Sequence, residues 1–176
     1  MEEVGQVLFT EEKIQKRIEA MAKEIDKDYF GREIFLIGVL KGAFVFMSDL
    51  VRHLEAPVTL DFMSIASYGD TTSSTGVVKL LKDLDTDVES RHVLVVEDIV
   101  DTGLTLNYLL KNLATRHPAT LKVCTLLDRP ARRKVKVDVH YVGFTIPDVY
   151  VVGYGLDFAQ KYRNLPYIAE LSPVGA

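Results

Sequence analysis

The chain has 176 residues, of which 48% are hydrophobic, so it can bury a complete core, and its length favours one domain. The 21 Lys and Arg residues against 25 Asp and Glu residues give a net charge of −4, which argues against a broad nucleic-acid-binding face or an anionic-membrane surface. One cysteine excludes an intrachain disulfide, and neither a signal peptide nor an apolar run of membrane-spanning length is present, so we expect a cytoplasmic protein.

Apolar residues follow helical and strand patterns in alternation. Thr10 precedes apolar residues at helical spacing, which predicts an N-capped amphipathic helix over Glu11–Asp28. Unbroken apolar runs predict buried strands over Ile34–Leu40 and residues 58–65, 93–97 and 121–127, with weaker candidates at 137–143 and 149–152. Helical spacing recurs at residues 43–54 and 104–115. This alternation predicts an α/β fold with a mostly parallel sheet of about five strands.

A polar loop, a charge-dense stretch and the single cysteine each lead to a structural prediction. Residues 66–75 are rich in Ser, Thr and Gly, which predicts a mobile, functional loop, with a floppy excursion as the alternative. Residues 79–91 are dense in charge and predict a solvated edge without chemistry. Cys124 lies within an apolar run, which predicts a buried structural thiol.

The segment VLVVEDIVDTGLTL, residues 93–106, carries the most chemical information. Its four apolar residues deliver Glu97 and Asp98 at the C-terminal end of a strand, where open α/β sheets bind ligands. Asp101, two threonines and Gly103 then lie where the pattern becomes helical, so backbone N–H groups and hydroxyls can converge on one phosphate. Acids beside such a loop indicate a sugar phosphate bound with a divalent metal ion.

The motif EDIVDTGLT resembles the phosphoribosyl pyrophosphate (PRPP) motif of type I phosphoribosyltransferases. Other segments resemble the hypoxanthine-guanine branch of that family: LKGAF at residues 40–44, SYGDTTSSTG at 67–76, LLDRP at 126–130 and IPDVYVVGYGLDFAQKYRNLPYI at 146–168. The resemblance covers nearly the whole chain. It implies the type I phosphoribosyltransferase fold as a single domain over residues 1–176, with a small hood from the N-terminal region and part of the segment after Pro130.

The resemblance also implies an activity. The enzyme would transfer the 5-phosphoribosyl group of PRPP to N9 of hypoxanthine or guanine, which gives IMP or GMP plus pyrophosphate in purine salvage. It implies Mg²⁺ as cofactor and a homodimer or homotetramer. Neither a nucleic acid nor a membrane is an expected partner.

By motif position, the resemblance implies a role for each site residue. Asp101 would be the general base toward purine N7. PRPP and ribose phosphate would be bound by Glu97, Asp98, Asp101, Thr102, Gly103, Leu104 and Thr105. Pyrophosphate would be bound by Leu40, Lys41, Gly42 and Arg163, with a cis peptide at Leu40–Lys41. The purine would be bound by Arg129, Tyr150, Val151 and Asp157, metal by Glu97, Asp98 and Asp157, and Ser67 and Tyr68 would form a lid.

Several alternatives remain open at this stage. Arg129 stands where the family commonly has lysine, and Val149 where some relatives have lysine, so the resemblance implies the reaction class but leaves recognition of the purine 6-position open. Asp101 can also be a helix N-cap, Tyr150 a core aromatic, and Lys41 and Arg129 surface cations. The rival functions are a xanthine or adenine phosphoribosyltransferase, and a non-catalytic, nucleotide-sensing RNA-binding regulator on the same fold.

Overall fold

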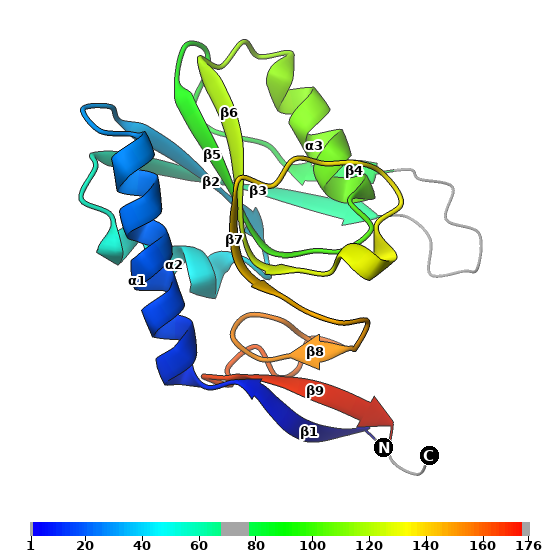
Figure 1. Cartoon of the computed structure of the whole chain (residues 1–176). Coiled ribbons are helices and arrows are strands. Elements are labelled where there is room, and N and C mark those ends of the chain that lie inside the picture. Colours follow the sequence, from blue (N-terminus) through cyan, green and yellow to red (C-terminus); the bar gives the residue numbers. More distant parts are fainter. Residues whose placement is uncertain (1, 68–77, 174–176) are drawn as a thin grey trace.

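A six-stranded sheet with helices on both faces forms the body of the protein, and a three-stranded sheet lies at one end of it (Figure 1). This computed structural model describes residues 2–67 and 78–173. The helices are α1 (Glu11–Asp28), α2 (Phe44–His53) and α3 (Leu104–Ala114), with a 3₁₀ turn at Pro130–Arg132. Among the described residues, no helix is long and apolar enough to span a membrane.

The large sheet has the strand order β4-β3-β2-β5-β6-β7. Its strands are β2 (Ile34–Leu40), β3 (Val58–Ser67), β4 (Val78–Lys82), β5 (His92–Val100), β6 (Thr120–Asp128) and β7 (Tyr141–Thr145). Five of them pair in parallel, and β4 is an antiparallel strand at one edge. The predicted α/β fold with a parallel sheet of about five strands is confirmed.

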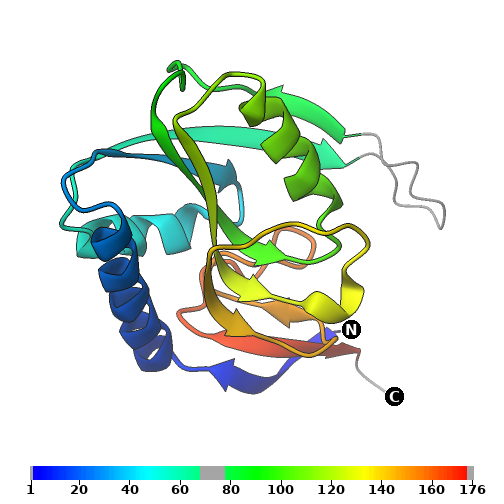
Figure 2. The ribbon, with the colours of Figure 1, turned by 45° about the horizontal axis from the view of Figure 1, so that its top comes forward.

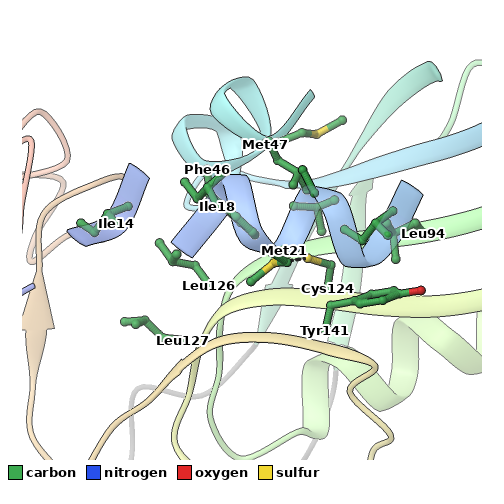
Figure 3. Close-up of a cluster of buried hydrophobic side chains, with 14 of the residues drawn as sticks. Ile14, Ile18, Met21, Phe46, Met47, Leu94, Cys124, Leu126, Leu127 and Tyr141 are labelled. Atoms are coloured by element: carbon green, nitrogen blue, oxygen red, sulfur yellow. Dashed lines mark hydrogen bonds between the residues drawn. The ribbon is translucent and has the colours of Figure 1, made fainter. Parts of the chain in front are cut away.

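Alternate residues of the central strands build two cores, one on each face of the sheet. Leu94 and Val96 of β5 pack in the cluster formed with α1 and α2, whereas Val93 and Val95 pack in the cluster that contains α3. Figure 3 shows the first cluster, where Ile14, Ile18 and Met21 of α1 lie over the sheet. Cys124 is fully buried there, so the prediction of a buried thiol is confirmed. The strands therefore have the unbroken apolar runs that burial on both faces requires.

Most predicted elements are close to the observed ones. The helix Glu11–Asp28 and the strand Ile34–Leu40 are confirmed at both ends, and Thr10 caps α1 by accepting a hydrogen bond from Lys13 N at 3.3 Å. The strand predicted to end at residue 97 is too short, because Ile99 and Val100 continue to pair with β6.

Other predictions need correction. The strand expected over residues 137–143 begins only at Tyr141, since Val137 and Val139 pack against the α3 side of the sheet instead. Strand β4 overlaps the start of the charge-dense stretch, where half-buried and exposed residues alternate as at a sheet edge. Strands β4, β1 and β9 were not predicted.

We call the three-stranded sheet and the segments that flank β8, residues 147–150 and 153–167, the hood. Its strands are β1 (Glu2–Phe9), β9 (Ile168–Pro173) and β8 (Val151–Val152), paired antiparallel in that order. Figure 2 shows these strands in blue, red and orange beside the body.

A polar cluster joins the hood to α1 and α2. The carboxylate of Asp49 on α2 accepts hydrogen bonds from Gln15 Nε2 at 2.8 Å and from the hydroxyl of Tyr154, which follows β8. Arg52 also pairs with Asp49. Burial raises the pKa of Asp49, but the hydrogen bonds from these three side chains outweigh burial and leave the pKa below its ordinary value. The hood is thus held to the body by a charged acceptor.

We predict that Asp49→Asn lowers the free energy of unfolding by about 1–3 kcal/mol near neutral pH, because its amide would turn a donor toward existing donors. A depressed pKa stabilises the fold above the unfolded-state pKa, about 4, and that contribution disappears as pH falls through the folded-state pKa. Urea denaturation should therefore show the full difference in free energy of unfolding between wild type and Asp49→Asn at about pH 7, and a smaller difference at about pH 3. The exposed Asp138→Asn serves as control, and equal effects of the two substitutions would contradict the prediction.

Candidate functional site

The candidate site lies where the two central strands end. From β2 the chain passes through α2 to β3 on one side, and from β5 it passes through α3 to β6 on the other. The carboxyl ends of β2 and β5 therefore flank the switch point of the sheet, which is the usual ligand position in open α/β folds. Lys41 and Gly42 follow β2 there, and Glu97 and Asp98 lie near the end of β5. The predicted acids and the predicted lysine loop are thus brought together.

The loop between β5 and α3 lines a cavity of about 200 Å³. Gly103 has φ 80° and precedes α3 without a side-chain cap, and Leu104 N donates to Thr102 Oγ1 at 3.3 Å. Within the described residues, the backbone N–H groups of Thr102 and Gly103 have no hydrogen-bond partner. Glu97, Asp101, Thr102, Gly103 and Thr105 are among the residues that line the cavity. Free N–H groups beside hydroxyls and a helix N-terminus form an anion-binding nest.

Among the described residues, neither of the two adjacent acids of β5 forms an ion pair. Burial and then the neighbouring Asp98 raise the pKa of Glu97, which is 7% exposed, well above its ordinary value. Burial raises the pKa of Asp98 to about 6, although the N–H of Ile99 and the charge of Arg163 lower it. A bound cation would relieve this cost of burying carboxylates.

The donor set suits a magnesium ion held partly by substrate. Among the described residues, no group of three His, Cys, Asp or Glu side chains could hold a metal ion by itself. Mg²⁺ typically uses one or two carboxylates and completes its shell with water and substrate phosphates. Glu97, Asp98 and Asp157 supply the hard oxygen ligands that this ion prefers, so the residues present fit it.

A second cavity, of about 290 Å³, adjoins the same acids. Its lining includes Asp98, Asp101, Tyr150, Val151 and Asp157, as well as Arg129 and Arg132. Tyr150 is 46% exposed and its ring makes an edge contact with Phe158, with centroids 5.7 Å apart. Val151 is buried in β8. The hood therefore covers this cavity with an aromatic face and a backbone edge.

Arg129 is buried beside Asp101. Its Nε and one terminal nitrogen donate to the two carboxylate oxygens of Asp101 at 3.2 and 2.7 Å, and the other terminal nitrogen donates to the carbonyl of Val149. Arg129 is only 6% exposed, so the alternative of a surface cation is wrong. The exposed Arg132 pairs with Asp148 at 2.7 Å and approaches Asp101 at 3.9 Å. Asp101 thus faces two guanidinium groups.

A third group of side chains surrounds the loop after β2. The peptide bond Leu40–Lys41 is cis, as expected. Lys41 Nζ donates to Gln160 Oε1 at 3.2 Å, and Arg163 pairs with Asp157 at 2.8 Å and donates to the Gly155 carbonyl at 2.7 Å. Arg163 also donates to Gln160 Oε1 at 3.3 Å, so the two cations expected to bind pyrophosphate share this acceptor.

Gly42 and Gly155 allow the body and the hood to touch at this point. A Cβ on Gly42 would lie 1.7 Å from Asp98 Oδ2, and a Cβ on Gly155 would lie 2.3 Å from the Gly42 carbonyl oxygen. Gly155 also has φ 96°, which favours glycine. The turn Gly153-Tyr154-Gly155 therefore serves close packing, and no helix follows it as a dinucleotide loop would require.

Some expected residues lie outside these contacts, and some were missed. Ser67 ends β3, whereas Tyr68 and the rest of the expected lid lie outside the described residues. Sequence reasoning missed Arg132 and Arg133, although the basic run RPARRK directly after β6 was a visible signal. It also missed Gln160, for which the sequence has no local signal.

Comparisons with known proteins agree with this geometry. The sequence profile of the phosphoribosyl transferase domain matches residues 6–159. A hypoxanthine-guanine phosphoribosyltransferase of Mycobacterium avium is 51% identical over 177 residues, which cover 97% of this chain and 87% of that protein. One of Bacillus subtilis is 48% identical over 171 residues, covering 97% and 95%.

Solved structures give the same result. The crystal structure of a hypoxanthine-guanine phosphoribosyltransferase from Bacillus anthracis, with HEPES in its active site, has a TM-score of 0.92 at 48% identity and covers 98% of this chain and 100% of that one. A hypoxanthine phosphoribosyltransferase from Staphylococcus aureus has a TM-score of 0.93 at 45% identity, covering 97% and 92%.

We predict that Gly42→Ala displaces the Asp98 carboxylate, because the added methyl group would occupy its place. Overpacking of this kind should lower the free energy of unfolding by about 1–3 kcal/mol. A crystal structure of the variant and urea denaturation measure the two effects. Gly5→Ala is the matched control, since its Cβ would meet the nearest atom at 3.4 Å. An unmoved Asp98 in Gly42→Ala would show that the site tolerates a side chain here.

Proposed function

The chain belongs to the phosphoribosyl transferase family, and we propose how the residues of its site divide the work. The protein is a purine salvage enzyme that transfers the 5-phosphoribosyl group of PRPP to N9 of hypoxanthine or guanine. The products are IMP or GMP and pyrophosphate. The observation that carries this function is the anion-binding nest beside Glu97 and Asp98 at the switch point, in a chain about half identical to hypoxanthine-guanine phosphoribosyltransferases over nearly its whole length.

The two ends of PRPP would be held by separate loops. Thr102, Gly103 and Thr105 would bind the 5′-phosphate, with the N–H of Leu104 at the start of the helix nearby. Lys41, the Leu40 and Gly42 backbone, and Arg163 would bind pyrophosphate. These groups supply local positive charge in a chain of net charge −4, which a polyanionic substrate needs.

Glu97 and Asp98 would contact the ribose hydroxyls and support the metal-bound sugar, and Asp157 would hold an ion on the pyrophosphate side. When bound, Mg²⁺ supplies charge neutralisation of the departing pyrophosphate. The raised pKa of both β5 acids indicates that they are costly to keep charged without such a ligand. The protein residues thus orient the sugar for attack at its anomeric carbon.

Asp101 would accept the proton from purine N7 while Arg129 holds its carboxylate. Tyr150 would stack on the base, and the Val151 backbone and Asp157 would face its edge. Arg129 would donate to the 6-oxo group, since guanidinium groups only donate hydrogen bonds. The pair between Arg129 and Asp101 connects recognition of the base with the position of the group that removes its proton.

Turnover of hypoxanthine, guanine, xanthine and adenine in parallel, with pyrophosphate release as readout, tests this function. We expect the two 6-oxopurines hypoxanthine and guanine to react fastest. Preference for xanthine or adenine would change the substrate assignment. Binding of RNA in a gel-shift assay without pyrophosphate release would favour a regulatory protein instead. Analytical ultracentrifugation would test the homodimer or homotetramer that we propose.

We predict that Asp101→Asn lowers kcat by about 10² to 10⁴, the usual contribution of a positioned general base. PRPP binding should change little, because the phosphate nest consists mainly of backbone and hydroxyl groups. Steady-state kinetics and calorimetric PRPP titration measure the two effects. Near-normal kcat in this variant would remove Asp101 from the base role.

We predict that Arg129→Gln lowers the ratio of kcat/KM for hypoxanthine to kcat/KM for adenine. A glutamine amide oxygen can accept a hydrogen bond from the 6-amino group of adenine, whereas a guanidinium group can only donate. An unmatched buried polar group costs about 1–3 kcal/mol, so the ratio of kcat/KM values should shift by about 10-fold or more. Arg129→Lys keeps a donor and should retain the wild-type ratio. An unchanged ratio in Arg129→Gln would place 6-oxo recognition on other groups, such as the backbone near Val151.

A further inference from the structure

The segment that follows β6 runs behind the phosphate nest and binds its backbone. Residues 129–135 lie there, and Arg133 is the part of this segment that reaches both the nest and the sheet. We propose that Arg133 is a positioning residue, which holds the Asp101–Thr102–Gly103 loop in its phosphate-binding shape while Asp128 holds Arg133. This inference rests on the proposed function, because the loop is taken to bind the 5′-phosphate.

Three consecutive carbonyls of the loop are tied to this one segment. The Val100 carbonyl accepts from Arg129 N at 3.0 Å, and the Asp101 carbonyl accepts from Arg133 Nε at 2.9 Å. The Thr102 carbonyl accepts from the N–H groups of Lys134 at 2.9 Å and Val135 at 3.3 Å. The back of the loop is therefore hydrogen-bonded by residues that do not line its cavity, although Arg129 lines the second cavity.

Because the peptide unit is planar, these hydrogen bonds also set the direction of the N–H groups in the loop. In a trans peptide, the carbonyl of one residue and the N–H of the next point in opposite directions. Fixing the Asp101 and Thr102 carbonyls at the back therefore directs the N–H groups of Thr102 and Gly103 to the front. Those two N–H groups have no partner among the described residues, and both residues line the cavity.

Arg133 is itself held rigidly. Its side chain is 20% exposed and pairs with Asp128, whose side chain is 18% exposed. Asp128 ends β6 and is paired with Val100 of β5, so the anchor belongs to the sheet. Arg133 also packs on the loop, because a Cβ on Gly103 would lie 3.0 Å from Arg133 Cδ. A planar guanidinium can bind a carbonyl and a carboxylate together, which a lysine ammonium does less well.

Arg133 differs from its neighbours in what it touches. Arg129 and Arg132 face the Asp101 carboxylate, whereas the polar contacts of Arg133 with described residues are to backbone carbonyls and Asp128. Loss of Arg133 should therefore weaken the binding of ligands that carry a 5′-phosphate and leave the binding of the free purine base unchanged. This selectivity separates a positioning role from a merely structural one.

The test compares Arg133→Met and Arg133→Lys with the wild-type protein. We expect the methionine variant to raise the KM for PRPP and the calorimetric Kd for ribose 5-phosphate by about 10-fold to 100-fold, the range seen when groups that orient a ligand-binding shell are removed. The KM for hypoxanthine should stay within about twofold of wild type. The lysine variant should recover part of the loss. If Arg133→Met does not fold, Asp128→Asn should show a smaller shift of the same kind.

Arg116→Met is the matched control. Arg116 is 27% exposed and pairs with Asp83 at 2.8 Å after α3, away from the cavity. Equal losses of thermal stability in both methionine variants, with unchanged Kd for ribose 5-phosphate, would overturn the proposal. Failure of the proposed function is distinguishable, because wild-type protein would then release no pyrophosphate with any purine while the ribose 5-phosphate titrations still report on Arg133.

Discussion

The site depends on one topological constraint: β2 and β5 are neighbours at the centre of a parallel sheet while their crossovers leave in opposite directions. No helix can then cover the gap between the two strand ends. Gly42 and Asp98 meet in this gap so closely that a methyl group on Gly42 would overlap the carboxylate. The loop after β2 and the acids of β5 are thereby fixed relative to each other by sheet hydrogen bonds.

The charges around the gap are arranged as a binding site and not for stability of the free protein. Glu97 and Asp98 have raised pKa values because desolvation disfavours their charged forms, and neither forms an ion pair within the part of the chain that the structure describes. The arginines nearby are instead paired with other acids, Arg163 with Asp157 and Arg129 with Asp101. Uncompensated buried carboxylates are costly, and such groups cluster where a ligand completes the charge balance. A magnesium ion bound with a sugar diphosphate would supply the positive charge that Glu97 and Asp98 lack.

Local patterns were sufficient to predict the elements that form the body. Helix α1 and strand β2 followed from apolar patterns alone, because α1 buries its apolar face in one core and β2 buries alternate residues in both cores. Strands β1 and β9 were not predictable in the same way, since they are stabilised by pairing with each other across almost the whole sequence. The acids and the phosphate loop were visible because they are contiguous in one motif. Arg133 and Gln160 act through contacts that only folding creates, and Arg133 sits in a basic run that is usually a solvated surface.

Arg129 is a residue whose contacts could not be predicted from the sequence, because they depend on the number and arrangement of its N–H donors. A guanidinium has five N–H donors, of which one lies on each Asp101 oxygen and one on the Val149 carbonyl. Donors therefore remain for an acceptor on a ligand without loss of the Asp101 pair. A lysine ammonium has three donors and no planar fork, so the same three contacts would leave it none. Arginine in place of the common lysine thus allows one buried side chain to hold the Asp101 carboxylate and still to have N–H donors left for a ligand.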